Sequence, residues 1–478
     1  MSGLASQHTH NLSPSFALST SRLSKINSPP PPPASPRSMM PGAVEVAKAV
    51  RQDRKSTLFP ARASQPRQPK LSWSDLQMLC CNYIQKGLVY SMAEGSFDFR
   101  SVAELLKKSL SEALVDFCPL AGRLATSADG VVYIDCNDRG VDFVEASAPD
   151  VGVADIVTDN VSPVVRELFA LDGAININGH FLPLLTIQVT KLRDGIVVGF
   201  TVNHAVVDGT ALWQFINCWA QLCRESSSAA FAHPPLHTRC FTSPSPIKLN
   251  LQTPKTPSLD KFSPPPFSEK VFHFTGETIS RLKERATRAS KDGLRISSFQ
   301  ALSAHIWQAI TRARDLPPTE LTTFKLAVNC RPRIVPPLPY SYFGNAIQFV
   351  SATITAEELL SSDMSHAAGI LNRIISAHQD ENIRAQLEQT PTVTQLDKSS
   401  PKNTVMMGSS PRFPMYDNDF GWGRPVGVRS GWANKFDGKM SAYPGPDGSG
   451  NVDIEICLLP QTMRSLESDP LFHFSCCD

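Results

Sequence analysis

The residues best suited to chemistry follow an apolar, β-branched run, GIVVGFTVN, at positions 195–203. His204 comes directly after this run, and Asp208 stands four residues further on. An imidazole can abstract a proton near neutral pH because its unperturbed pKa is about 6.5. The pattern therefore predicts a general base at the end of a strand. The alternative is structural, a histidine that caps a strand beside an aspartate that closes a turn.

A second cluster lies near the C-terminus, where residues 419–423 read Asp-Phe-Gly-Trp-Gly. Two glycines around a tryptophan favour a tight, hinged turn, and an aspartate there can accept hydrogen bonds from the backbone of its own loop. Composition and spacing alone interpret this segment as a structural turn.

The elements that position these residues are predicted by apolar periodicity. The runs 184–192 and 195–203 read as two strands of a hairpin, and 452–459 alternates like a half-buried strand. Residues 101–117 and 296–310 carry apolar side chains at helical spacing. Strand and helix signals are mixed along the whole chain, which indicates an α/β fold.

Composition divides the chain into four parts. We expect a disordered extension at 1–43, an N-terminal lobe at 44–223, a proline-rich crossover loop at 224–270 and a C-terminal lobe at 271–478. Prolines in the third part lack an amide donor, so they oppose a helix or a central strand there. The two lobes are of similar size, and we expect an active-site channel between them.

Charge and cysteine content exclude several classes of protein. With 46 Lys and Arg against 44 Asp and Glu, the net charge of +2 offers no electrostatic case for a nucleic acid or an acidic membrane. No apolar run approaches the roughly 20 residues of a membrane-spanning helix. Eleven cysteines without a CxxC pair predict no zinc site and favour a reducing compartment.

The first 38 residues contain no Asp or Glu and many Ser. This composition cannot bury a core, so we expect a disordered extension upstream of a start at Met39 or Met40. Without a targeting role for this segment, we expect a cytoplasmic protein. The alternative is a plastid transit peptide, because such peptides are also rich in Ser and poor in acidic residues.

HAVVDG at 204–209 and DFGWG at 419–423, taken together, resemble the signature motifs of the plant BAHD acyltransferases. The resemblance extends from about residue 44 to 470 in the same order. It includes the segments LSWSDLQ (71–77), SLSEALVDFCPLAGRL (109–124), CNDRGVDFVEA (136–146), SSFQALSAHIWQA (297–309) and NCRPRIVPPLPYSYFGNA (329–346).

The resemblance implies a role for each residue of the first motif. His204 matches the general base, and Asp208 matches an aspartate that points away from the substrate and braces the loop through an arginine. Arg331 is the first candidate for that arginine and Arg333 the second. Gly209 and Arg331 are therefore expected to support the site structurally.

The second motif implies contacts with the thioester donor. We expect Asp419 to belong with His204 and Asp208 to the catalytic residues, although a carboxylate in a tight turn is expected to accept hydrogen bonds rather than to transfer protons. Gly421 matches a structural position. Trp422 and Gly423 match a loop near the coenzyme A entrance, and Ser298 is expected to bind coenzyme A as well.

One segment departs from the family pattern. Hydroxycinnamoyl-transferring relatives tend to carry Thr-Ser-Trp where this chain has Gly408, Ser409 and Ser410. The tryptophan of those relatives is linked to holding the acceptor or the oxyanion. Ser410 keeps a hydroxyl that can donate a hydrogen bond, so we expect it to contact the substrate, whereas the indole N–H is gone.

The resemblance implies an acyl-CoA-dependent transferase that acylates a hydroxyl or an amine of a plant specialised metabolite. Acyl-CoA would be a co-substrate, with no permanently bound cofactor, no metal, no nucleic acid or membrane partner, and a monomeric state. Two alternatives stay open. The first is a family member that uses the same base for a cleavage without coenzyme A, of lyase type, and the second is a catalytically silent binding protein on the same fold.

The acid-free, proline-bearing composition of residues 1–38 predicts that this segment is dispensable for catalysis. A chain that starts at Met40 is expected to match the full-length chain in specific activity, measured on soluble protein. A clear loss of specific activity in the shorter chain would contradict this expectation, and import of the full-length chain into isolated plastids would contradict the cytoplasmic location.

Overall fold

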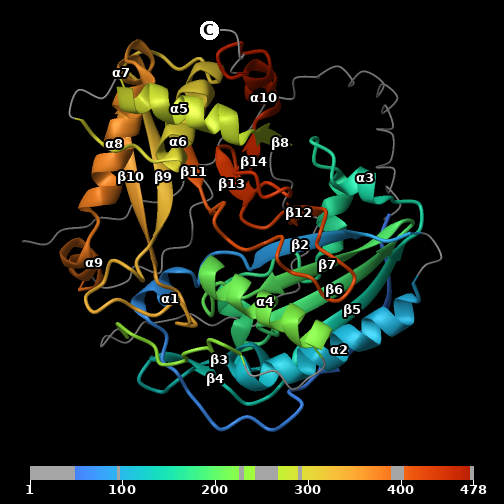
Figure 1. Cartoon of the computed structure of the whole chain (residues 1–478). Helices are drawn as coiled ribbons and strands as arrows, with labels where there is room; N and C mark the ends of the chain where they lie inside the picture. The colour runs from blue at the N-terminus through green and yellow to red at the C-terminus, as the bar shows by residue number, and fades with distance from the viewer. Residues whose placement is uncertain are drawn as a thin grey trace, which may run out of the picture. The chain divides into compact units, whose positions relative to one another are not determined.

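Two six-stranded β-sheets organise the part of the chain that the structure describes (Figure 1). This computed structural model describes residues 49–93, 97–225, 231–242, 267–288, 293–388 and 403–473. The sheets have the strand orders β1-β5-β6-β7-β2-β12 and β10-β9-β11-β13-β14-β8. Each sheet with its helices forms one lobe, so the expected α/β class with two lobes of mixed sheet and helices is confirmed. The 1–43 extension, and residues 226–230 and 243–266 of the predicted crossover loop, lie outside the described residues.

The first lobe contains a six-stranded sheet, a small two-stranded sheet and both α- and 3₁₀-helices. Its strands are β1 (Arg51–Leu58), β2 (Ile84–Ser91), β3 (Arg123–Thr126), β4 (Val132–Asp135), β5 (Val141–Ala148), β6 (Leu185–Leu192), β7 (Gly195–Val202) and β12 (Gly427–Ser430). Its helices are α1 (Trp73–Gln77), α2 (Phe99–Asp116), η1 (Cys118–Ala121), α3 (Val153–Ile156), η2 (Pro163–Leu168), η3 (Asn176–His180) and α4 (Gly209–Glu225).

The second lobe contains the other sheet and the remaining helices. Its strands are β8 (Ser268–Phe274), β9 (Leu321–Asn329), β10 (Ile347–Thr355), β11 (Thr404–Met407), β13 (Lys439–Pro444) and β14 (Val452–Leu458). Its helices are α5 (Gly276–Arg288), α6 (Ser298–Ala313), α7 (Ala356–Ser361), α8 (Met364–Ala377), α9 (Asp380–Leu387) and α10 (Pro460–Glu467). None of the described helices of either lobe is long and apolar enough to cross a membrane.

The predicted elements that bear on the site are present. The runs 184–192 and 195–203 form the antiparallel pair β6 and β7, and 452–459 forms β14. The predicted helix at 101–117 is α2, and the one at 296–310 is α6, which Ser297 caps by accepting a hydrogen bond from the Gln300 N–H at 3.2 Å. The hairpin delivers the chain directly to His204 because β7 ends two residues earlier.

Two strands cross the boundaries that composition suggested between the lobes. β8 begins at Ser268, so the end of the predicted crossover loop already belongs to the second sheet. β12 comes from the C-terminal part of the chain but pairs antiparallel with β2 of the first sheet. Through β12, a part of the C-terminal segment therefore belongs to the first sheet.

The second sheet presents two chemically different faces. Along β13, Met440 and Ala442 pack into the apolar core beneath the helices of the second lobe. Because successive side chains of a strand point to opposite faces, Lys439, Ser441 and Tyr443 point the other way. Tyr443 belongs to the core cluster of the first lobe, so this second face is turned toward the first sheet.

Polar side chains connect the two sheets. Lys86 on β2 donates a hydrogen bond to the Tyr443 hydroxyl at 3.2 Å, and Tyr443 in turn donates to Glu455 on β14 at 3.0 Å.

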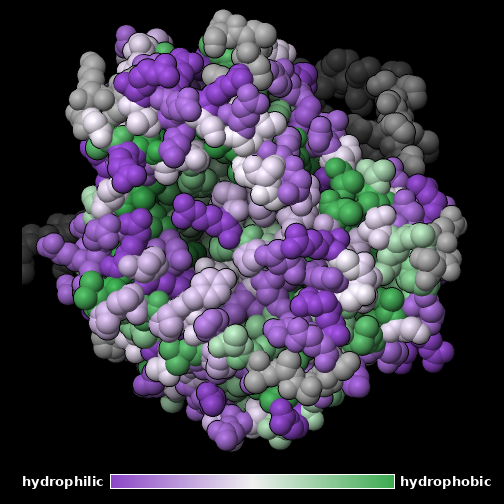
Figure 2. Space-filling model, viewed as in Figure 1, coloured by the Kyte–Doolittle hydropathy of each residue, from purple (hydrophilic) through white to green (hydrophobic). Residues whose placement is uncertain are grey.

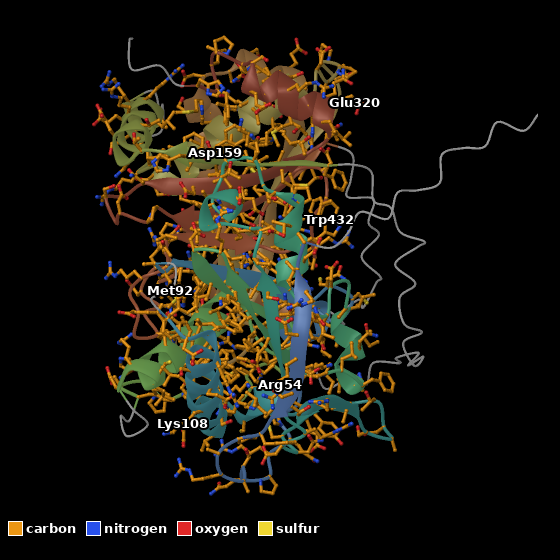
Figure 3. The ribbon with its side chains drawn as sticks, turned by 90° about the vertical axis from the view of Figure 1, so that its right-hand side faces the viewer. Arg54, Met92, Lys108, Asp159, Glu320 and Trp432 are labelled. Carbon is orange, nitrogen blue, oxygen red and sulfur yellow. The ribbon has the colours of Figure 1, made fainter. Side chains whose placement is uncertain are left out.

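Figure 3 shows the lobes from the side, with Glu320 in the second lobe and Lys108 in the first. The labelled Asp159 lies near their junction, where its carbonyl accepts a hydrogen bond from the Val271 N–H at 2.8 Å (Figure 3).

Candidate active site

His204 lies between the end of β7 and the start of α4. All eight residues of β7 are buried, so the strand is a rigid base for the residue that follows it. The His204 side chain itself is half-buried. Figure 2 shows a recess on this face of the molecule, above the end of α4 that lies beside α1 in Figure 1.

The backbone of His204 is held from both sides by asparagine side chains. The His204 N–H donates to Asn176 Oδ1 at 2.6 Å, and the His204 carbonyl accepts from Asn345 Nδ2 at 2.7 Å. Asn176 is fixed in turn, because its Nδ2 donates to the Met78 carbonyl at 2.7 Å. Asn176 comes from the first lobe and Asn345 from the second, so both lobes determine where the imidazole lies.

The environment of the imidazole favours its neutral form. Burial is the largest influence and lowers the pKa of His204, and the positive charge of Lys439 lowers it further. The carbonyls of His204 and Val207 and the charge of Asp208 oppose this shift without cancelling it. Nδ1 is buried and has no hydrogen-bond partner among the described residues. A neutral imidazole at neutral pH is the form that can accept a proton.

Asp208 is buried and makes a bidentate ion pair with Arg331. Arg331 donates to its two carboxylate oxygens at 2.6 and 3.1 Å. The backbone N–H groups of Ala211 and Ala346 also donate to it, at 3.0 and 2.9 Å. The Ala211 bond caps the N-terminus of α4. Arg333, the second candidate partner, instead donates to backbone carbonyls at the end of α8 at 2.8 and 2.9 Å.

These contacts determine the protonation state of Asp208. Burial alone would raise the pKa of Asp208, but the Arg331 charge and the hydrogen bonds outweigh it and leave the pKa below its ordinary value. The stabilisation from this pair is therefore complete above the pKa of the unfolded aspartate, about 3.9, and is lost as the pH falls through the folded-state value. At neutral pH both partners are charged and paired.

A second buried carboxylate supports the same region. Asp75, in α1, accepts from the backbone N–H and the Nδ2 of Asn345 at 3.0 and 2.8 Å and from the Ser72 N–H at 2.8 Å. Arg239 Nη1 lies 3.4 Å from the same carboxylate, and Arg239 Nη2 donates to the Val206 carbonyl at 2.8 Å. Asp75 thus orients the asparagine that holds the His204 carbonyl.

The second motif forms the tight turn that its glycines predict. One oxygen of the Asp419 carboxylate accepts from the N–H groups of Gly421 and Gly423 at 2.7 and 2.9 Å. Gly421 and Gly423 have φ of +111° and +100°, where an L side chain would be strained. The ring of Phe420 stacks on Trp422 at 5.7 Å, and Trp422 also contacts the core cluster of the first lobe.

The segment that leads into the second motif, residues 413–418, runs beside α4. Phe413 packs so closely on Gly209, the first residue of the helix, that a Cβ there would lie 2.6 Å from its ring. Gly209 is therefore required for close approach. In the middle of the helix, Asn217 donates to the side chain of Asn418 at 3.0 Å.

This arrangement places Asp419 at the opposite end of α4 from His204. Arg224, in the last turn, donates to the Asp419 carbonyl at 2.6 Å. Because α4 has 17 residues, its two ends lie about 25 Å apart at 1.5 Å per residue. The structure therefore does not bring Asp419 together with His204 and Asp208, and its contacts are those of a structural turn.

The remaining predicted site residues lie along the second lobe. Ser298 is the first residue of α6 and lines a cavity of about 520 Å³. The segment that follows β11 runs from Ser410 through Pro411 and Arg412, which line the same cavity, to Phe413 at the start of α4. Ser410 accepts a hydrogen bond from the Arg412 N–H at 3.3 Å, so its hydroxyl is turned back onto its own segment.

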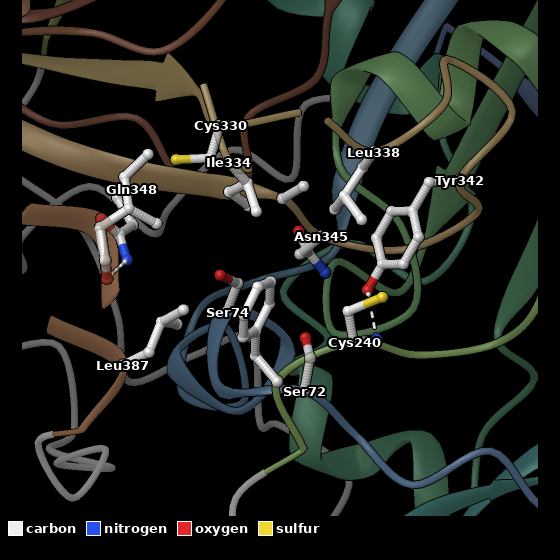
Figure 4. A pocket seen from close by; sticks show the side chains of 13 residues that line it. Ser72, Ser74, Cys240, Cys330, Ile334, Leu338, Tyr342, Asn345, Gln348 and Leu387 are labelled. Carbon is white, nitrogen blue, oxygen red and sulfur yellow. Dashed lines mark hydrogen bonds between the residues drawn. The ribbon is translucent and has the colours of Figure 1, made fainter. Parts of the chain in front are cut away.

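A much smaller cavity lies beneath the Asp75 network (Figure 4). It holds about 10 Å³, roughly the space of one water molecule. Tyr342 and Asn345 line it, and the Tyr342 hydroxyl accepts a hydrogen bond from the Cys240 N–H at 3.4 Å. Its size excludes a substrate, so it belongs to the supporting structure. In the described ranges no three His, Cys, Asp or Glu side chains are placed to hold a metal ion.

Sequence analysis missed several residues that the structure brings to the site. Asn176 carries no signal in the sequence, because its role depends on a contact made 28 residues away. Asp75 and Asn345 lie inside segments that resemble the family, but nothing in those segments pairs one with the other. Lys439, whose charge reaches His204, was not singled out at all.

Comparison with known proteins identifies the family. The model of the Transferase family matches residues 48–472. The BAHD acyltransferase DCR of Arabidopsis thaliana is 36% identical over 430 residues, covering 85% of this chain and 88% of the relative.

Two solved structures share the fold. Vinorine synthase is 24% identical with a TM-score of 0.66, over 87% of this chain and 96% of the other. F. graminearum TRI101, in complex with coenzyme A and T-2 mycotoxin, is 18% identical with a TM-score of 0.70, over 85% and 98%. At these identities the likeness concerns the fold alone.

The geometry predicts that His204→Ala and Asp208→Ala fail in different ways. His204→Ala removes a half-buried ring that makes no described side-chain hydrogen bond, so its melting temperature is expected to stay near that of wild type while turnover falls. Asp208→Ala leaves Arg331 buried without a counter-ion, which is expected to cost about 3–5 kcal/mol of the free energy of unfolding. Thermal melts and turnover at fixed acyl-CoA concentration measure both effects. If Asp208→Ala melts like wild type yet is inactive, Asp208 takes part in the chemistry.

Proposed function

The chain belongs to the BAHD family of acyltransferases, and from this premise we propose that it transfers an acyl group from a coenzyme A thioester to a hydroxyl or amine of a small plant metabolite. His204 is the general base of this reaction. The observation that carries the proposal is the half-buried, neutral imidazole, whose backbone is fixed by both lobes while its Nδ1 has no hydrogen-bond partner among the described residues.

The reaction needs one base and no covalent enzyme intermediate. His204 accepts the proton of the acceptor O–H or N–H as the oxygen or nitrogen attacks the thioester carbonyl. The tetrahedral intermediate then collapses, the carbon–sulfur bond breaks, and the imidazolium returns the proton to the departing thiolate. Asp208 does not relay a proton, because both of its oxygens are occupied by Arg331 and by backbone N–H groups. Its contribution is to hold the loop that carries His204.

Two features of the 520 Å³ cavity support it as the binding site for the phosphates of coenzyme A. The N-terminus of α6 opens on it at Ser297 and Ser298, and unpaired N–H groups at a helix start favour anions. Lys283 of α5 and Arg412 line the same cavity and supply positive charge. Phe413, the residue after Arg412, packs on Gly209 at the start of α4. A short segment therefore connects the cavity with the helix that follows His204.

Two other functions are compatible with the same residues. A lyase-type reaction would use His204 without coenzyme A, and a silent binding protein would use neither. The lined cavity and the intact base favour the transferase over both. A panel of acyl-CoA donors against pooled plant alcohols and amines separates the three, because only the transferase releases free thiol in proportion to acylated product. We also propose a monomer that acts in the cytoplasm, with the plastid as the alternative.

The lowered pKa of His204 predicts the pH dependence of the reaction. A base works only when deprotonated, so kcat/KM is expected to be level above neutral pH and to fall as the pH drops through the pKa of His204. The midpoint of this acid limb is expected below about 6.5, the ordinary value of histidine. Initial rates at subsaturating substrates, with melts at each pH to detect unfolding, test this. A midpoint above 6.5 would argue against His204 as the base.

The cavity assignment predicts a selective effect of Lys283→Met. The KM for acyl-CoA is expected to rise several-fold, because a charge-assisted contact to phosphate is lost. The rate with an acyl-pantetheine, which lacks the nucleotide phosphates, is expected to stay unchanged. Arg285→Met is the matched control, since two positions along a helix turn its side chain by about 200° to the other side. Equal losses with both donors would place Lys283 outside the phosphate site.

A further inference from the structure

We propose that Lys439 binds a carboxylate of one of the two substrates, the acceptor or the acyl group, close to His204. This inference rests on the proposed acyl transfer and adds the chemical class of substrate. Lys439 belongs to neither signature motif, and the reaction itself does not require it.

Lys439 begins β13 on the face of the second sheet that is turned toward the first lobe. In the register of the sheet, Met406 of β11 pairs with Lys439 on one side and with Lys325 of β9 on the other. The two lysines are thus two strands apart, about 10 Å at 4.8 Å per strand. Lys325 lies over the ring of Phe349 at 5.0 Å. This face of the second sheet therefore carries two lysines among apolar neighbours.

Gly408 makes room for the ammonium group of Lys439. A Cβ built on Gly408 would lie 2.0 Å from Lys439 Nζ, closer than any real contact. The φ of Gly408 is not in the left-handed region, so the backbone would accept another residue, and a side chain here would displace the flexible end of Lys439. Glycine at 408 and lysine at 439 therefore form one feature of this chain.

The protein supplies no anion for Lys439 from its described residues. Glu455, the carboxylate whose charge reaches it, is already paired with Lys435 at 3.0 Å and accepts from Tyr443 at 3.0 Å. Lys439 makes no ion pair or side-chain hydrogen bond with any residue the structure describes. Burial lowers the pKa of Lys439 to about 8; Lys325 adds to this shift, while Cys81 and Glu455 oppose it. A half-buried ammonium without a partner is costly, and a bound carboxylate would remove that cost.

The position of Lys439 specifies where the carboxylate would lie in the reaction. Gly408 lies against Lys439 Nζ, and Phe413, five residues further along the same segment, packs on Gly209 at the start of α4, so one short segment connects Lys439 with the helix that follows His204. The charge of Lys439 also lowers the pKa of His204, which agrees with this placement. An acceptor would then be a hydroxy or amino acid, with its nucleophile at His204 and its carboxylate at Lys439. A donor would be the thioester of a dicarboxylic acid. Met406 and Phe349 beside the lysines favour an apolar body between the two polar ends.

Equilibrium binding distinguishes the two sources of the carboxylate. The full-length protein is titrated in a calorimeter with 3-hydroxybenzoate and tyrosine, each beside its methyl ester, and with malonyl-CoA beside acetyl-CoA. In one arm the acid is expected to bind at least about tenfold more tightly than its uncharged counterpart, as a hydrogen bond between charged groups allows. The arm that shows the preference identifies the substrate that carries the carboxylate.

Variants connect this preference to Lys439. Lys439→Met is expected to abolish it, and Gly408→Ala, which keeps the charge but displaces the ammonium, is expected to weaken it. Lys191→Met, an equal charge change at an exposed position of β6, is expected to retain it. Thermal melts confirm that each variant is folded, and Gly408→Ala keeps the test decisive if Lys439→Met is not.

The outcomes separate this inference from the proposed function. It is overturned if no arm prefers the acid, if the preference survives in both Lys439→Met and Gly408→Ala, or if Lys191→Met loses it as well. His204→Ala is expected to keep the preference for the acid while losing turnover. If His204→Ala instead turns over like wild type, the proposed base fails, and the binding result for Lys439 stands by itself.

Discussion

The buried ion pair between Asp208 and Arg331 is the interaction on which the site depends. Asp208 caps α4 in the first lobe, and Arg331 follows β9 in the second. Separating the two lobes here would leave a buried charge without its counter-ion, which is costly in free energy. The pair therefore holds the two lobes in one position relative to each other. Arg331 also donates to the carbonyls of Tyr342 and Gly344 at 3.0 and 2.8 Å, so the same guanidinium shapes the loop that leads to Asn345.

This constraint explains how a site between two lobes can be precise. Asn345 is positioned by Asp75 and reaches across to the His204 carbonyl, while Asn176 holds the N–H from the opposite side. The hydrogen bonds fix the peptide, while Nδ1 of the imidazole has no hydrogen-bond partner in the part of the chain that the structure describes. Positioning and chemistry are therefore assigned to different atoms of one residue. The backbone carries the structural contacts, which leaves the ring for the role of general base that we propose.

Local patterns in the sequence predicted what depends on local structure. The hairpin that leads to His204, the helices α2 and α6 and the glycine turn around Asp419 follow from periodicity and from residues that favour turns. Arg331 as the partner of Asp208 followed from the family resemblance and not from spacing. The roles of Asn176 and Asp75 could not be predicted, because each depends on contacts between segments far apart in the sequence. The pairing of β12 with the first sheet was missed for the same reason.

The two signature motifs turn out to serve one helix from its two ends. Residues between Phe413 and Asp419 follow α4 from Gly209 to Arg224, so the second motif anchors the far end of the helix. The same segment begins at Gly408, directly after β11. A single stretch of chain therefore lines the 520 Å³ cavity, leaves space for Lys439 and packs on the first turn of α4. A change at Gly408 would displace the ammonium group of Lys439 without touching either motif, so in the inference drawn above it would change substrate binding while the contacts around His204 are kept.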